Sequence, residues 1–176
     1  MIIRSELAET AAALNTAHMM CAAARTAPKT RGIDNIVTMI ITDDDLKKLS
    51  GKMVELADGR ESIIRDAGNV LQAQAVVMIG VRRETYGLNC GYCGHATCEE
   101  CIASKGACIF ATTDLGIAIG SAVSTAADMR TDNRVMYSIG RIFGQMEESG
   151  EEDIIWMGIP LSVSGKNPFF DRKRAN

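Results

Sequence analysis

The sequence lacks the features of a membrane-spanning, secreted or nucleic-acid-binding chain. Its longest uncharged runs have 15 residues, at 10–24 and 67–81, whereas a transmembrane helix needs about 18 consecutive apolar residues. The opening nine residues contain no apolar stretch after a basic start, so they do not match a secretory signal. The formal net charge of −3 gives no basic footprint for nucleic acid. We therefore expect a cytoplasmic protein without a membrane or nucleic-acid partner.

Internal repeats and Pro- or Ser-rich linkers are also absent from the sequence. The chain has 176 residues, a usual length for one domain. Hydrophobic residues make up 47% of it, which is enough for a packed core and excludes disordered and collagen-like classes. We therefore expect a single domain over residues 1–176, with a cysteine-rich loop at 87–108 inserted within it.

Segments with helical and strand-like patterns alternate along the chain. Apolar residues recur at helical spacing in three segments, and we expect helices at 5–24, 43–58 and 114–129. Runs rich in β-branched residues predict strands at 36–41, 75–81 and 154–159. A weaker helix candidate lies at 62–71, and the pattern at 134–142 indicates a short strand or a loop. This alternation predicts an α+β or α/β fold.

Cysteine is unusually frequent and unusually clustered. Five of the six cysteines fall within 19 residues, with the spacing C-x2-C-x4-C-x2-C-x6-C: Cys90, Cys93, Cys98, Cys101 and Cys108. In a reducing compartment such clustering indicates metal or redox chemistry rather than disulfides. Thiolates this close together converge only around a central cation or cluster. Gly91 and Gly94 allow the sharp turns that such a loop needs.

Three inorganic sites compete as explanations of this spacing. A zinc ribbon separates its two C-x2-C pairs by about 15–20 residues, whereas only four residues separate them here. A plant-type 2Fe–2S site uses C-x4-C-x2-C with a distant fourth cysteine, but the one cysteine beyond that run is the nearby Cys108. A 4Fe–4S cluster bound by Cys90, Cys93, Cys98 and a fourth thiolate further along fits best. Zinc, 2Fe–2S and a loop of free thiols are the alternatives.

Two other residues with metal-binding side chains have more ordinary explanations. His95 lies between candidate ligands, but the loop already offers five thiolates, so we expect this imidazole to stay outside the metal coordination. Cys21 lies in an apolar helical segment, and we expect it to be a small core residue.

The motif Asn-Cys-Gly-x-Cys-Gly-x-x-x-Cys at 89–98 resembles the 4Fe–4S module of corrinoid iron–sulfur proteins and of ferredoxin-like electron-transfer subunits. In that pattern the fourth cysteine follows some distance after the third. The resemblance therefore implies Cys108 as the fourth ligand and leaves Cys101 as the alternative.

The rest of the chain resembles the nitroreductase-like FMN flavoproteins in the order of its segments. The matching segments lie at 22–41, 42–49, 114–129, 134–140 and 155–160. Together with the cysteine loop, they resemble a family of small ferredoxin-domain-containing proteins over nearly all of the 176 residues. The resemblance implies a nitroreductase-like mixed sheet flanked by helices, with the cysteine loop as an insertion, and a homodimer.

The same resemblance implies contacts to FMN. The phosphate of FMN carries a charge of about −1.5 to −2 and is bound by cationic and hydroxyl side chains. The loop after the first helix offers such side chains in seven residues: Arg25, Thr26, Lys29, Thr30 and Arg31. Arg172 lies in a second basic stretch, and Asn35 matches the family position at the edge of the flavin ring. A solvated basic loop is the alternative for either stretch.

We therefore expect a redox protein, an FMN-dependent oxidoreductase in which a 4Fe–4S cluster passes electrons to the flavin. An iron–sulfur electron carrier without flavin and a structural zinc protein are the alternatives. The sequence indicates no general acid or base. It predicts a redox partner or a small-molecule substrate without identifying either.

Overall fold

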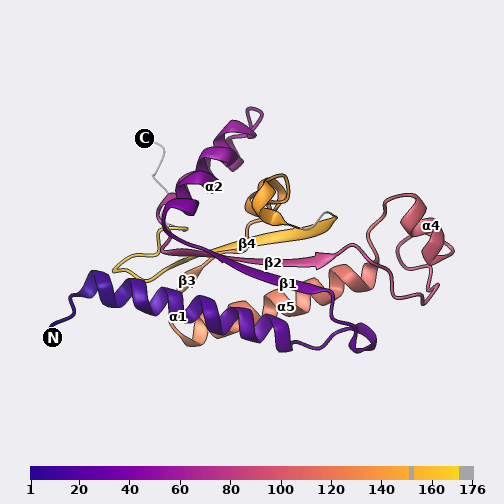
Figure 1. Cartoon of the computed structure of the whole chain (residues 1–176), viewed down its shortest axis with the longest axis horizontal. Helices are drawn as coiled ribbons and strands as arrows, with labels where there is room; N and C mark the ends of the chain where they lie inside the picture. The colour runs from indigo at the N-terminus through magenta and orange to yellow at the C-terminus, as the bar shows by residue number, and fades with distance from the viewer. Residues whose placement is uncertain (151–152, 171–176) are drawn as a thin grey trace.

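The computed structural model describes residues 1–150 and 153–170, which form a sheet with helices on both faces (Figure 1). The four strands found in these residues have the order β1-β2-β4-β3, and every neighbouring pair is antiparallel. Their bounds are β1 Ile36–Ile41, β2 Ala75–Arg82, β3 Asp132–Asn133 and β4 Ile154–Ser162.

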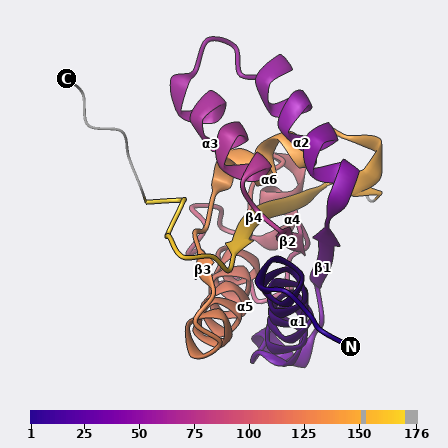
Figure 2. The same cartoon turned by 90° about the vertical axis from the view of Figure 1, so that its left-hand side faces the viewer.

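Two layers of helices cover this sheet (Figure 2). The two long helices, α1 (Ser5–Thr26) and α5 (Ile109–Asp128), lie side by side on one face. The opposite face is covered by α2 (Asp43–Glu55), α3 (Glu61–Leu71) and α6 (Tyr137–Phe143). The short α4 (Cys98–Ala103) lies beyond one end of the sheet (Figure 1), and the 3-10 turns are η1 (Thr30–Gly32) and η2 (Glu147–Ser149).

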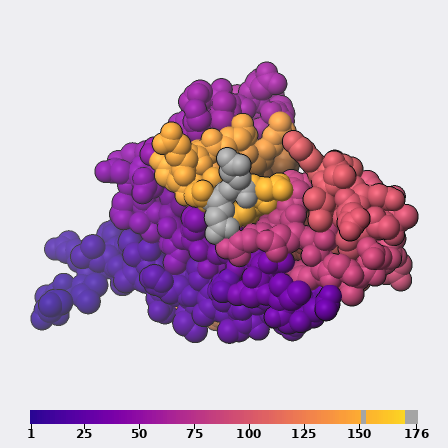
Figure 3. Space-filling model, turned by 45° about the vertical axis from the view of Figure 1, so that its right-hand side comes forward, coloured from indigo at the N-terminus to yellow at the C-terminus, as the bar shows by residue number. Residues whose placement is uncertain are grey.

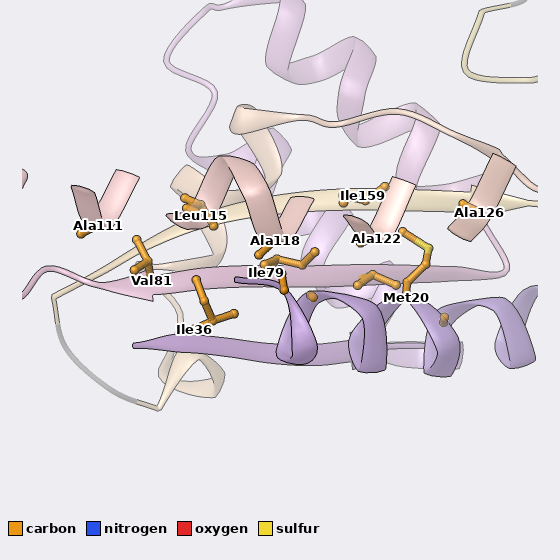
Figure 4. Close-up of a cluster of buried hydrophobic side chains, with 14 of the residues drawn as sticks. Met20, Ile36, Ile79, Val81, Ala111, Leu115, Ala118, Ala122, Ala126 and Ile159 are labelled. Carbon is orange, nitrogen blue, oxygen red and sulfur yellow. The ribbon is translucent and has the colours of Figure 1, made fainter. Parts of the chain in front are cut away.

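Strand β2 divides the hydrophobic core into two clusters. It pairs with β1 on one side and β4 on the other, and seven of its eight residues are buried. Because successive side chains of a strand point to opposite faces, Val77 and Ile79 join the cluster under α1 and α5. Figure 4 shows this cluster, with Ala118 of α5 beside Ile79 and Ala122 beside Met20 of α1. Val76 and Met78 face α2, α3 and α6.

Helix α6 packs with unusually close backbone contact on β4. A Cβ atom placed on Gly140 would lie 1.9 Å from the carbonyl oxygen of Trp156. The indole of Trp156 meets the ring of Phe143 edge-on, with 5.3 Å between the centroids. The identity of residue 140 therefore determines how closely α6 approaches the sheet.

The predicted fold class is confirmed, and most predicted elements are present. The strand at 36–41 has the predicted bounds, and the weak candidate at 62–71 forms α3. The expectation of a strand or loop at 134–142 was wrong over most of its length, since 137–143 form α6. The long apolar run predicted as a helix at 114–129 begins five residues earlier, at Ile109.

Helix α5 has the length and composition of a membrane-spanning helix. Its mean hydropathy is 1.3, and 33% of the apolar window is buried within the chain. The helix nevertheless packs against α1 and β2 as part of the core. A single helix of this kind is weak evidence for a membrane span. The packing of α5 leaves the apolar side chains of Ile109 and Ile117 exposed.

Candidate metal centre

The cysteine loop follows the end of β2 and ends at the start of α5, which packs on the sheet. Figure 3 shows this part of the chain as a protrusion at one end of the molecule. Between residues 87 and 107 only Cys101 is buried. The loop therefore holds little core of its own, and its conformation depends on turns and polar contacts.

Helix α4 fixes the spacing of two cysteines. The hydroxyl oxygen of Thr97 accepts a hydrogen bond from the backbone N–H of Glu100 at 3.2 Å. The carboxylate of Glu100 accepts one from the N–H of Ala96 at 3.0 Å. This reciprocal pattern is close to a capping box and stabilises a helix start. It places Cys98 and Cys101 one helical turn apart on neighbouring positions of the same face.

All five cysteines of the loop line one hollow. Cys101 and Cys108 are buried, whereas Cys90, Cys93 and Cys98 are half-buried. Leu88 and Phe110 contribute apolar walls, and further lining residues are Thr85, Tyr86, Asn89, Gly91, His95 and Thr97. The sixth cysteine, Cys21, packs against the core under α1.

The Cys98 thiol lies among hydrogen-bond donors. Its sulfur accepts a hydrogen bond from the backbone N–H of Asn89 at 3.4 Å, and the Asn89 side-chain oxygen accepts one from the N–H of Cys98 at 2.8 Å. Backbone donors from 87–89 and the Thr85 hydroxyl hold the pKa of Cys98 below its usual range. Asn89 adopts a φ of 46°, and Gly87 one of 68°. N–H donors directed at thiolate sulfur are typical of iron–sulfur sites.

Cys101 lies next to three other thiols of the hollow. Burial raises its pKa first, followed by the contact with Cys93 and the charges of Cys108 and Cys98. A Cβ atom on Gly106 would lie 3.1 Å from the Cys101 sulfur and 3.1 Å from Nε2 of His95. A side chain at position 106 would therefore displace the thiol or the imidazole.

The His95 imidazole is held at the rim of the hollow. Its Nε2 lies 3.1 Å from the hydroxyl of Ser104, which itself donates to the carbonyl of Cys101 at 2.9 Å. This contact directs Nε2 of His95 toward Ser104.

The donor set fits an iron–sulfur cluster. It consists of thiols, which are the ligands of such clusters, and it offers more of them than the four that one cluster requires. Within the described ranges, no three His, Cys, Asp or Glu side chains are grouped so as to hold a single metal ion. Four sulfurs around one zinc ion would lie about 3.8 Å from each other.

The predicted phosphate-binding cations Arg25, in the last turn of α1, and Lys29, just after this helix, are engaged by protein groups. Arg25 forms an ion pair with Asp34 and donates to the carbonyl of Ile36. Lys29 lies 3.9 Å from the same carboxylate and donates to the carbonyl of Ala27 at 3.0 Å. The Thr26 hydroxyl donates to a carbonyl within its own helix, and Arg172 lies outside the described residues.

Thr30 and Arg31 join this loop to the base of the cysteine loop. Thr30 donates its N–H and its hydroxyl to Asp114 at 2.9–3.1 Å. Arg31 donates to the carbonyl of Tyr86 at 2.8 Å, and the Tyr86 hydroxyl donates to Asp114 at 2.6 Å. Burial, and then the hydrogen bond to Asp114, raise the pKa of Tyr86.

Among the predicted flavin contacts, Asn35 has a buried side-chain donor without a hydrogen-bond partner in the described part of the chain. The residue is 5% exposed and lies beside Tyr86. Its Nδ2 makes no hydrogen bond there. A buried amide without a partner carries a free-energy cost of about 1–3 kcal/mol, which a bound acceptor would remove.

Comparison with known proteins gives the family. A family described as uncharacterized protein containing a ferredoxin domain (DUF2148) matches residues 104–172. A protein of Archaeoglobus fulgidus, described as an uncharacterized protein, is 40% identical over 164 residues, which cover 88% of each chain. This chain belongs to that ferredoxin-domain family. The matched region begins after α4 and includes Cys108.

Solved structures show that the ferredoxin-domain protein has a nitroreductase-like fold. An FMN-bound nitroreductase of Bacteroides fragilis matches with a TM-score of 0.60 at 11% identity, over 100% of this chain and 86% of its own. A nitroreductase family protein of Clostridium novyi gives 0.58 at 14% identity, over 93% and 76%. At these identities the likeness concerns the fold alone.

Proposed function

We propose that this protein is a redox protein that binds a 4Fe–4S cluster in the cysteine hollow. The proposed ligands are Cys90, Cys93, Cys98 and Cys108, with Cys101 as the alternative fourth ligand. The convergence of five thiols on one hollow carries this proposal. The ferredoxin domain named in the family description supports it. When bound, such a cluster transfers single electrons.

The residues around the thiols have distinct parts in this proposal. Asn89 orients Cys98 through two mutual hydrogen bonds, so the sulfur faces the hollow with its N–H donors in place. The capped start of α4 keeps Cys98 and Cys101 at a fixed separation. Leu88 and Phe110 restrict the access of water with apolar walls.

We further propose that FMN is the second cofactor of an oxidoreductase, with Arg25, Thr26, Lys29, Thr30, Arg31, Arg172 and Asn35 as contacts. The unpartnered Nδ2 of buried Asn35 supports this, as does the FMN held by the Bacteroides fragilis nitroreductase. When bound, FMN can accept single electrons and deliver two to a substrate. To reach a phosphate, Arg25 and Lys29 would have to leave Asp34. The alternative is an electron carrier without flavin.

We also propose that the protein is a cytoplasmic homodimer. The outward face of α5 presents Ile109, Thr113, Gly116, Ile117, Gly120 and Ser124, and within the helix the first exposed charge is Asp128 at its end. Such a face is uncharged over several turns, and a second copy would cover its exposed isoleucines.

The visible absorption spectrum of protein purified without air tests the cofactor proposals together. Two flavin bands above a broad iron–sulfur shoulder, all bleached by dithionite, are the expected result. A shoulder without flavin bands would favour the electron carrier and contradict the FMN proposal. A colourless protein that contains zinc and no iron would contradict the iron–sulfur proposal. Iron, sulfide and zinc analysis of the same sample separates these outcomes.

A further inference from the structure

Asp114 is a buried carboxylate at the base of the cysteine loop. It is 2% exposed, and no Lys or Arg of the described residues forms an ion pair with it. It accepts hydrogen bonds from the N–H and hydroxyl of Thr30 and from the hydroxyl of Tyr86. These two residues, Thr30 and Tyr86, lie 84 and 28 residues before Asp114 in the sequence.

All of these contacts direct hydrogen-bond donors at the Asp114 oxygens. An ionised carboxylate is purely an acceptor, and here three donor groups supply hydrogen to its two oxygens. The Tyr86 contact, at 2.6 Å, has the short length that a charged acceptor gives to an O–H donor. The side chain therefore holds a negative charge inside the protein that is stabilised by dipoles and not by an opposite charge.

This negative charge lies close to the cysteine hollow. Cys108 immediately precedes α5, and Asp114 follows it by six residues, which is about 9 Å along a helix axis. Helical side chains lean toward the N-terminus of the helix, which shortens the separation. Tyr86 bridges the two, because it lines the hollow together with Cys108 and donates a hydrogen bond to Asp114. Charges at this range interact appreciably inside proteins.

We propose that Asp114 lowers the reduction potential of the cysteine-bound centre and that Tyr86 moderates this effect. The inference rests on the proposed iron–sulfur cluster. One-electron reduction, with dithionite as the electron donor, adds one negative charge to the centre. Repulsion from Asp114 makes that addition less favourable, and the Tyr86 hydrogen bond disperses part of the repelling charge.

The test is an anaerobic redox titration of purified protein at pH 8, after its iron and sulfide have been measured. Asp114→Asn removes the charge but keeps the shape. At a fixed potential we expect the ratio of reduced to oxidised centre to rise on the order of tenfold, which for one electron is a shift of 59 mV. Asp128→Asn, at the exposed far end of the same helix, is the matched control and should leave the ratio unchanged.

Tyr86→Phe separates the charge effect from a structural one. It keeps the carboxylate but removes one donor, so the midpoint potential should fall, opposite in sign to Asp114→Asn. If both variants shift the potential in one direction, or if Asp114→Asn does not shift it, the inference about Asp114 is overturned. The proposal that the protein binds a cluster is not affected by that outcome. If Asp114→Asn binds no iron, a fall in Tyr86→Phe supports the inference and no fall refutes it. Wild-type protein without iron would overturn the proposed function itself.

Discussion

Cys93 is the thiol that tests the proposed ligand set most directly. It belongs to the 4Fe–4S and the plant-type assignments alike, and it contacts Cys101 inside the hollow. We expect Cys93→Ser to lose most of the bound iron and sulfide, because a hydroxyl is a poor substitute for a thiolate ligand. Metal and sulfide analysis measures the loss. Cys21→Ser, outside the loop, should retain both, and full retention in Cys93→Ser would refute the assignment.

The fourth ligand is decided by comparing two neighbouring buried cysteines. We expect Cys108→Ser to lose the cluster and Cys101→Ser to retain it, since the motif resemblance assigns the fourth position to Cys108. Both thiols lie in the hollow, and Cys101 interacts with three others there. Iron content and the visible spectrum of the two variants give the answer. Loss in Cys101→Ser alone would reverse the assignment.

Gly106 limits the space around Cys101 and His95. Because a Cβ atom there would lie 3.1 Å from both the sulfur and Nε2, we expect Gly106→Ala to lower the iron bound per chain. The free energy of unfolding should change by less than about 1 kcal/mol, since the loop contributes little core. Gly51→Ala, with open space around its Cβ position, is the control. Unchanged iron in Gly106→Ala would contradict this packing.

Residues that act through local sequence spacing were predictable, and those that meet across the fold were not. The spacing of the five cysteines predicted that they converge, and they line one hollow. The Tyr86–Asp114 contact joins residues 28 apart on a loop and a helix. A buried charge on the apolar helix face was the one available signal, since Asp114 falls between Ala111 and Ala118 of the core. The sequence did not reveal its partners.

At the scale of elements, the close contact of α6 with β4 makes the strongest stability prediction. A methyl group on Gly140 would meet the Trp156 carbonyl, so we expect Gly140→Ala to lower the free energy of unfolding by about 1–3 kcal/mol. Gly68→Ala in α3 has open space around it and should raise that free energy by about 0.5–1 kcal/mol. Urea denaturation of both variants measures these changes. Equal stability of the two would contradict the packing.

The segment of α6 was predicted as a strand or loop because its residues have low helix propensity, and packing on the sheet is what makes it helical. The seven residues 137–143 are rich in aromatic and β-branched side chains and include a glycine, all of which lower helix propensity. The helix is stabilised by packing, with Ile139, Ile142 and Phe143 buried against the sheet. The longer elements were predictable because their apolar periodicity extends over several turns.

At the scale of the molecule, the uncharged outer face of α5 is where we expect a second copy to bind. Ile117 on this face is 40% exposed, and we expect Ile117→Glu to convert the dimer to a monomer, because pairing would bury the introduced carboxylate. Size-exclusion chromatography with light scattering measures the mass. Ile64→Glu on α3, at a site 47% exposed, should remain dimeric. A monomeric wild-type protein would refute the proposal.

The division between a packed sheet and a protruding cysteine loop has a consequence for the order of assembly. Tyr86 and Cys108, at the two ends of the loop, belong to the core under α1 and α5, whereas Cys101 is the single buried residue between them. The core of the scaffold therefore does not depend on the loop, and the chain can fold before any inorganic cofactor is bound. If the proposed cluster is bound, iron and sulfide would be added to a chain that is already folded, at a loop whose residues are mostly exposed.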